Sequence, residues 1–249
     1  MKLKLLILFL FLQFSSSCQI NLVPNPSFEE WDIRFRQFGD YIFPKQWINP
    51  TSCTPDYFTS DTTTWLGTVP DNYHGHSYAF DGKGYCFIGL RDDTTFGHGN
   101  YKEYLEVELN ESLLPNRYYY VSYYFRWADS CTMAVYDLGL YFSQTKISYD
   151  SLLTLTMYTP QIKNDSGNFL TNDFWVKYSG YYLAQGGEKF IVIGNFKEDE
   201  NTDYIFLRHP DISHYSTTTW AAGYFIDMVS VIECEYPIKQ ANAGNDKRC

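Results

Sequence analysis

The chain has 249 residues, a formal net charge of −10 at pH 7, and aromatic and charged residues in equal shares of 19 % each. The acidic balance argues against a nucleic acid or an anionic membrane surface as the partner. The 23 Tyr and 19 Phe suit β-strands far better than surface helices, and the length is sufficient for one large domain with its own core.

Residues 1–18 have the three regions of a secretory signal peptide. Two lysines precede an apolar run over Leu5–Leu12, and three serines follow before Cys18. The run is too short to span a membrane, and no later stretch is apolar enough to do so. We therefore expect an exported protein at the cell surface, in the outer membrane or outside the cell. Cys18 offers a site for a lipid anchor, with ordinary cleavage before Cys18 or after Gln19 as the alternative.

The segment from Asn21 to Asp71 predicts one strand followed by long irregular loops. Prolines interrupt it repeatedly, and the T-S-D-T-T-T run at Thr59–Thr64 is typical of a loop. The apolar G-Y-C-F-I-G-L run at Gly84–Leu90 then predicts a strand.

Alternating apolar residues predict strands through the rest of the chain. The segments are Leu105–Leu109, Tyr118–Trp127, Tyr136–Phe142, Trp175–Tyr182, Gly186–Phe196 and Gly223–Ile232. The inward residues expected in the third segment are Tyr136, Leu138, Leu140 and Phe142. Phe196–Ala222 is expected to be a surface loop. About eight to ten strands without a long periodic helix indicate an all-β, two-sheet sandwich.

The two ends of this predicted fold carry a resemblance. The opening reads N-L-V-P-N-P-S-F-E-E-W at Asn21–Trp31, and the closing strand reads G-Y-F-I-D-M-V-S-V-I. They resemble the ends of jelly-roll β-sandwich modules of the carbohydrate-binding, galactose-binding-like kind. That resemblance implies a structural calcium ion shared by Glu29 and Asp227. Strand parity also places Asp227 on the face of Phe225, Val229 and Val231, where a buried carboxylate requires a cation.

A longer series of motifs narrows the resemblance. Trp47, T-P-D-Y-F at Thr54–Phe58, V-P-D-N-Y-H-G at Val69–Gly75 and Y-K-E-Y-L at Tyr101–Leu105 occur in this order. The series resembles an exported N-terminal domain of surface proteins from Bacteroidetes-type bacteria. These include OmpA-like proteins and proteins associated with gliding motility or type IX secretion. The resemblance implies one jelly-roll domain over residues 20–235. Residues 236–249 resemble a linker and the start of a truncated PKD-like, immunoglobulin-type repeat.

Cysteine spacing gives little support to a zinc or redox site. Setting aside the first and last of the six cysteines leaves Cys53, Cys86, Cys131 and Cys234, with no C-x-x-C among them. We expect one or two structural disulfides or simply buried thiols, and the sequence does not choose between them.

Catalytic motifs are absent from the sequence. It contains no G-x-S-x-G, no H-E-x-x-H and no phosphate-binding glycine loop, so we expect no enzyme activity. His74 and His76 lack a third ligand at metal-binding spacing.

Aromatic side chains are the candidates for ligand binding. Sugar rings stack on aromatic planes while polar neighbours take their hydroxyls, so exposed aromatics predict an extracellular or cell-wall glycan as the partner. The predicted ligand-binding residues are Trp65, Trp220 and Tyr73, of which Trp65 and Trp220, in Thr-rich loops, are expected to be exposed. A glycan-binding or adhesive module predicts an exposed aromatic pair with polar neighbours. A structural spacer of a larger envelope protein predicts buried aromatics, and a glycan-acting enzyme, the weakest alternative, predicts two facing carboxylates.

Overall fold

The computed structural model of the chain describes residues 19–34, 41–64, 67–92, 99–152, 154–207 and 221–235. The predicted signal peptide and lipid-anchor site lie outside these ranges, as does the predicted linker and repeat at 236–249. Trp65 and Trp220 also lie outside them. Within these ranges, no helix combines the length and the apolar character needed to cross a membrane.

Antiparallel strands dominate the described residues. The first eight strands are β1 (Trp31–Arg34), β2 (Tyr41–Pro44), β3 (Trp47–Ile48), β4 (Asp56–Thr59), β5 (Asp71–Asn72), β6 (Gly75–His76), β7 (Gly84–Arg91) and β8 (Leu105–Glu108). The remaining strands are β9 (Tyr118–Trp127), β10 (Met133–Val135), β11 (Gly139–Ser143), β12 (Ile162–Lys163), β13 (Val176–Leu183), β14 (Phe190–Gly194), β15 (Tyr204–Phe206) and β16 (Ala222–Cys234). A short 3-10 helix, η2 (Asp199–Asn201), precedes β15.

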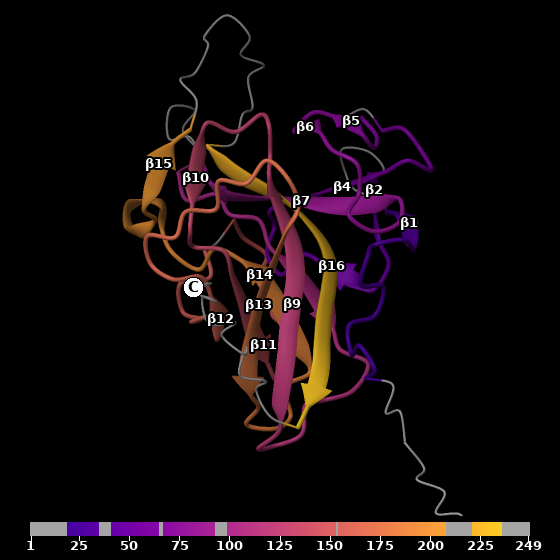
Figure 1. Cartoon of the computed structure of the whole chain (residues 1–249), viewed down its shortest axis with the longest axis vertical. Coiled ribbons are helices and arrows are strands. Elements are labelled where there is room, and N and C mark those ends of the chain that lie inside the picture. Colours follow the sequence, from indigo (N-terminus) through magenta and orange to yellow (C-terminus); the bar gives the residue numbers. More distant parts are fainter. Residues whose placement is uncertain are drawn as a thin grey trace, which may run out of the picture.

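Two five-stranded sheets form the sandwich (Figure 1). The β11 sheet has the order β12-β11-β14-β8-β3, and the β9 sheet has the order β13-β9-β16-β7-β4. Every neighbouring pair in both sheets is antiparallel. Most neighbours are distant in sequence, as in a jelly roll. The predicted all-β jelly-roll sandwich is therefore confirmed.

Strand β9 shows how the alternating pattern builds the core. Its inward residues, each at most 2 % exposed, are Tyr119, Val121, Tyr123, Phe125 and Trp127. They belong to one apolar cluster with Leu140 and Phe142 of β11 and with Ile191 of β14. Burial of this continuous apolar surface between the sheets is the main stabilising term of the fold.

The opening and closing stretches of the domain lie side by side. Asn21 forms a β-bridge with Ile232. Its Nδ2 donates to the carbonyl oxygen of Val229 at 3.0 Å, and its Oδ1 accepts from the amide of Val231 at 2.9 Å. The amide of Val229 also donates to the carbonyl oxygen of Pro26 at 2.9 Å. The start of the domain therefore satisfies the main chain of β16 beyond the part that pairs with β7.

A β-bulge in β16 overturns part of the parity prediction for Asp227. Asp227 lies opposite Tyr124 of β9, whereas Ser230 lies opposite Ser122, so two residues of β16 stand against one of β9. Met228, at the bulge, has a φ of 51°. A bulge of one residue moves all later side chains to the other face of the strand.

The prediction for the neighbours of Asp227 is consequently right on one side of the bulge and wrong on the other. Phe225 does share a face with Asp227, since both pair with residues on the outer side of β9. Val229 and Val231 point instead into the core, where both are fully buried. Regular alternation along Gly223–Ile232 gave no sign of the extra residue.

Two predicted boundaries are also wrong. The strand expected at Tyr136–Phe142 begins only at Gly139, because residues 136–138 form the link from the end of β10 to β11. In this link the Tyr136 hydroxyl donates to Asp203 at 2.5 Å. The expected surface loop Phe196–Ala222 contains β15, which pairs with β10 in a two-stranded ribbon.

The thiol alternative applies to the cysteines. Among the described residues, Cys53 and Cys86 are buried free thiols, Cys131 is buried, and Cys234 is a partly exposed free thiol.

A smaller apolar cluster lies on the outer side of the β11 sheet. It includes Leu155, Val192 and Phe196, and it encloses the carboxyl group of Glu106, whose residue is fully buried. Glu106 Oε1 accepts a hydrogen bond from the Ile147 amide at 2.7 Å, while Oε2 is buried without a partner. Burial raises the pKa of Glu106 to about 7.

We predict that the stability of the protein falls as the pH rises from 4.5 to about 7. Over this range Glu106 holds a proton in the folded state and loses it in the unfolded state, since its pKa moves from 4.5 to about 7 on folding. Glu106→Gln keeps the acceptor for Ile147 and removes the charge. Urea unfolding at pH 8 should show the variant more stable than the wild type by about 2 kcal/mol, with little difference at pH 4.5. Glu108→Gln, on the same strand but exposed, should change neither value; equal effects of the two substitutions would contradict the prediction.

Candidate functional site

Asp227, one of the two predicted calcium ligands, is fully buried at the bulge of β16. Its Oδ2 accepts hydrogen bonds from the amides of Phe80 at 2.9 Å and Asp81 at 3.0 Å, and its Oδ1 accepts from Met228 at 2.7 Å. Burial raises the pKa of Asp227 to about 8, although these three hydrogen bonds act in the opposite direction.

Glu29, the other predicted ligand, contacts the same loop. Its Oε1 accepts from the amides of Lys83 at 2.7 Å and Gly84 at 3.0 Å. Gly82 lies so close that a Cβ there would come within 2.3 Å of the Glu29 carboxyl carbon, and its φ is +66°. Asp227 and Glu29 therefore bind the same loop at residues 80–84, Asp227 at its start and Glu29 at its end.

The donor set agrees with calcium in type, because calcium prefers carboxylate and carbonyl oxygens. The number of side-chain ligands is lower than a calcium ion requires. Among the described residues, no group of three His, Cys, Asp or Glu side chains could hold a metal ion. A calcium ion here would have to complete its six to eight ligands, roughly, from main-chain carbonyls and water. The calcium site stays a prediction.

Of the three aromatics predicted to bind a ligand, only Tyr73 is described. It is partly buried in the turn between β5 and β6, with its ring 5.4 Å from the ring of His74 in an edge-on arrangement. Its role stays a prediction, and Trp65 and Trp220 lie outside the described residues.

The structure presents a different aromatic surface, on the outer side of the β9 sheet. Strands β13, β9 and β16 lie side by side (Figure 1). Residues directly opposite one another in antiparallel strands share a face. The register forms three rows: Ser179–Ser122–Ser230, Tyr181–Tyr120–Ile232 and Leu183–Tyr118–Cys234. We call these nine residues, together with Lys177, the open face.

The tyrosine row supplies exposed rings. Tyr181 is 38 % exposed, and its ring centroid lies 5.3 Å from that of Tyr120 with the planes tilted by 55°. The Lys177 ammonium lies 5.0 Å from the Tyr120 centroid, within range of a cation–π interaction. The aromatic pair therefore has a cationic hydrogen-bond donor directly beside it.

The serine row lies next to these rings. Within the described part of the chain, the hydroxyls of Ser122, Ser179 and Ser230 form no hydrogen bond to another residue. Each hydroxyl can both donate and accept. Ser179 is exposed and Ser230 partly exposed, whereas Ser122 between them is only 4 % exposed. The two accessible hydroxyls beside tyrosine rings form a surface suited to a polar ligand that also has apolar faces.

An aromatic loop closes one end of the open face. Phe80 stacks on Tyr124 with centroids 3.5 Å apart and planes 16° apart. The indole nitrogen of Trp175 donates to the carbonyl oxygen of Tyr78 at 2.8 Å, which ties this loop to the start of β13. The loop before β7 thus covers the outer side of the sheet only as far as Tyr124.

The aromatics of the open face differ from Trp65, Trp220 and Tyr73, which remain untested predictions for a ligand site. Tyr118 and Tyr120 alternate along β9 with its core residues and therefore lie on the outer face of that strand. The useful signal was the repetition of Ser and Tyr two residues apart in two strands, at Ser122 with Tyr120 and at Ser179 with Tyr181. Only the pairing of β9 with β13 aligns the two repeats.

Comparisons with known proteins add a similarity of fold. No protein-family model matches this sequence, and no curated protein matches it. The CBM22-1 xylan-binding domain of Paenibacillus barcinonensis Xyn10C matches with 12 % identity and a TM-score of 0.38, over 85 % of this chain and 93 % of that one. The CBM22-1-CBM22-2 tandem domain of the same protein matches with 13 % identity and a TM-score of 0.42, over 86 % of this chain and 49 % of that one.

An adhesin domain matches at a similar level. The K1 cleaved adhesin domain of Lys-gingipain from Porphyromonas gingivalis W83 has 15 % identity and a TM-score of 0.35, over 85 % of this chain and 96 % of that one. Identities this low leave the function to be argued from the residues of this chain.

We predict that Asp227→Ala strongly destabilises the protein even without any metal. The substitution leaves the amides of Phe80, Asp81 and Met228 without their acceptor, at a cost of about 3 kcal/mol. Urea unfolding in the presence of a chelator measures this. The control, Asp71→Ala, removes a carboxylate whose side chain is 78 % exposed and should change stability by less than about 1 kcal/mol. Equal stability of Asp227→Ala and the wild type would show that these hydrogen bonds do not hold the loop.

Proposed function

We propose that this protein is an exported, non-catalytic cell-surface module that binds a glycan on its open face. The single observation that carries the proposal is the pair of accessible serine hydroxyls, Ser179 and Ser230, in the row next to the Tyr120–Tyr181 ring pair, whose Tyr181 is exposed and whose Tyr120 is partly exposed. A pyranose ring has an apolar face for a tyrosine ring and equatorial hydroxyls at its rim. The tyrosine rings stack on the apolar face of the sugar, and the serine hydroxyls and Lys177 form hydrogen bonds with its hydroxyls.

The chemistry of the open face supports binding without catalysis. Glycoside hydrolysis requires two carboxyl groups flanking the scissile bond. The ten residues of the open face include no carboxylate, and Asp227, opposite Tyr124, has its carboxyl group engaged by three main-chain amides. A glycan laid along β9 therefore meets aromatic rings, hydroxyls and one ammonium group.

The shape of the open face favours a chain over a single sugar. The rows follow the strands from Ser122 to Tyr118, and successive rows lie two residues apart, at about 3.4 Å per residue. Exposed side chains continue along β13 from Lys177 to Leu183. A flat, elongated surface of this kind suits an extracellular or cell-wall polysaccharide and a role in adhesion.

We predict that Tyr120→Ala and Tyr181→Ala each weaken glycan binding by about tenfold, because each removes one stacking surface. A glycan array with the wild type identifies the ligand, and calorimetric titration with that ligand measures the variants. Tyr204→Ala is the matched control, since Tyr204 is 40 % exposed on β15, outside the open face.

Two outcomes would contradict the proposal. The first is an array without any bound glycan, which would favour a structural spacer in a larger envelope protein. The second is a bound glycan whose affinity is unchanged in both tyrosine variants, which would locate binding elsewhere on the molecule.

Our proposal includes a structural calcium ion held by Glu29 and Asp227, which would join β16 to the loop at residues 80–84. Support comes from the hydrogen bonds that both carboxylates accept from main-chain amides of this loop. Glu29→Gln separates the metal from the amide contacts, since Gln keeps an acceptor oxygen for Lys83 and Gly84 but has no charge.

We predict that calcium raises the melting temperature of the wild type and not that of Glu29→Gln, while the two proteins melt alike in chelator. Calcium stabilises only the folded state that binds it, so the shift should grow with calcium concentration. Thermal unfolding followed by circular dichroism tests this. A wild type that melts at the same temperature in calcium and in chelator would remove the metal from the proposal and leave the glycan surface unaffected.

A further inference from the structure

A cavity of about 260 Å³ lies at the end of the β11 sheet, away from the open face in sequence and in its strands. Its walls come from three segments: the link between β10 and β11, the segment from Thr156 through β12 to Ser166, and the residues that follow β14. The lining includes three aromatic and three charged residues: Tyr136, Tyr158, Phe196, Asp137, Lys163 and Lys197.

Aromatic rings supply the apolar part of the cavity. Tyr158 is partly buried, with its ring 4.9 Å from that of Tyr141, and its hydroxyl lies 3.1 Å from the hydroxyl of Tyr149. Phe196 and Tyr136 are each 6 % exposed. The contacts of Tyr158 and the burial of Phe196 and Tyr136 hold the three rings in place. The cavity therefore keeps a defined apolar surface without a ligand.

An ion pair supplies the polar part. Lys197 Nζ lies 2.8 Å from Asp137 Oδ1, and their side chains are 45 % and 10 % exposed. Asp137 Oδ2 is buried without a hydrogen-bond partner, and burial raises the pKa of this carboxyl group. A nine-tenths buried carboxylate that lacks one partner, beside a half-exposed ammonium side chain, is an incomplete polar site in need of a hydrogen-bond donor.

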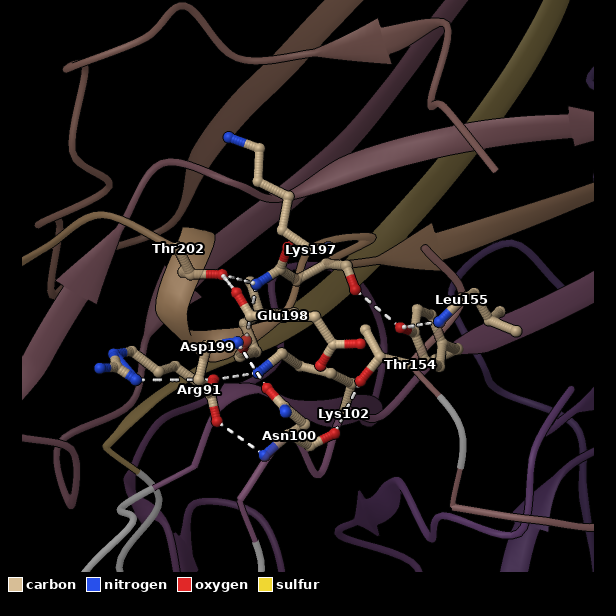
Figure 2. A network of polar contacts seen from close by, with 12 residues as sticks. Arg91, Asn100, Lys102, Thr154, Leu155, Lys197, Glu198, Asp199 and Thr202 are labelled. Carbon is tan, nitrogen blue, oxygen red and sulfur yellow. Dashed lines mark hydrogen bonds and ion pairs between the residues drawn. The ribbon is translucent and has the colours of Figure 1, made fainter. Parts of the chain in front are cut away.

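The wall that carries Lys197 is anchored by a buried polar network (Figure 2). Asn195 Nδ2 donates to Leu90 and to Thr202 Oγ1, both at 2.9 Å, and its Oδ1 accepts from the Lys197 amide at 3.0 Å. The Tyr104 hydroxyl donates to the carbonyl oxygen of Asn195 at 2.7 Å.

The same network continues below the wall. Asp199 pairs with the fully buried Lys102, lies 3.5 Å from Arg91, and accepts from the Asn100 amide at 2.9 Å. Figure 2 shows the Lys197 side chain extending away from these contacts. The backbone at Lys197 is therefore fixed, and its side chain reaches the ion pair with Asp137.

Charge and size decide the class of ligand. Lys163, Lys197 and Asp137 all line the cavity. Asp203 accepts a hydrogen bond of 2.5 Å from the hydroxyl of Tyr136, another lining residue. Two positive and two negative groups leave no net charge for an anion or a cation to prefer. The volume falls below the roughly 300 Å³ typical of the smallest drug-sized sites, so one small ring fits and a polymer segment does not.

We propose that this cavity is a second binding site, which takes a single neutral sugar residue or cyclic polyol through two adjacent hydroxyls. One hydroxyl donates to Asp137 and the next accepts from Lys197, while the ring lies against Tyr158. This arrangement completes the hydrogen bonding of the buried carboxylate, and it operates independently of the open face.

Titration of the full chain with simple methyl pyranosides tests the proposal. The probes are the methyl glycosides of glucose, galactose, mannose and xylose, with cyclohexanol as a ring compound that has one hydroxyl and no adjacent pair. We expect at least one glycoside to bind and to shift the NMR signals of Tyr158 and Gly139, with cyclohexanol at least about tenfold weaker. Asp137→Asn and Lys197→Met should each weaken the bound glycoside by about tenfold.

Controls separate this site from the open face. The Tyr120→Ala/Tyr181→Ala double variant should bind the methyl glycoside as the wild type does, even where it has lost the polysaccharide. Lys163→Gln, at an exposed position of the lining, tests the site without disturbing the buried pair and should weaken binding less than Asp137→Asn.

The proposal would be overturned if no glycoside binds, if cyclohexanol binds equally well, or if folded Asp137→Asn and Lys197→Met both keep wild-type affinity. Loss of the glycoside in the double tyrosine variant would also overturn it and assign the binding to the open face.

Discussion

The structure depends on how one buried carboxylate is satisfied. Asp227 lies in the middle of the apolar strand β16, where an unpartnered charge would be costly. Three main-chain amides converge on it, two from the loop before β7 and one from Met228. These hydrogen bonds fix the β-bulge, and the bulge sets the direction of every later side chain in β16. The apolar valines then face the core, while Ser230 and Ile232 face outward.

The same hydrogen bonds decide which part of the β9 sheet is covered. By holding residues 80 and 81, Asp227 brings Phe80 onto Tyr124. The covering loop ends there, and Tyr120, Tyr181, Ser179 and Ser230 beyond it stay at least partly exposed. The hydrogen bonds to Asp227 thus cover the β9 sheet around Tyr124 and orient Ser230 and Ile232 toward the open face. The stability of the loop and the shape of the open face are consequences of the same contact.

The two sheets contribute differently to the proposed function. The open face consists of residues on regular strands, so its geometry is fixed by the ladders of β13, β9 and β16. The cavity at the β11 sheet consists mainly of connecting segments, and a buried polar network holds them in place. A polysaccharide chain suits the first surface and a single ring suits the second. Such a division would allow one module to contact a glycan at two points of different chemistry.

The sequence by itself determined the fold class, because alternation in strands such as Tyr118–Trp127 already separates a core face from a second face. Short motifs at the two ends of the domain also predicted a shared site for Glu29 and Asp227, and the structure shows that both carboxylates contact the loop at residues 80–84. It did not reveal the bulge at Met228, since one extra residue leaves the local pattern apolar. It did not reveal the open face either. Ser179 and Tyr181 meet Ser122 and Tyr120 only through pairing of strands more than fifty residues apart, and such pairing is decided by the packing of the whole sandwich.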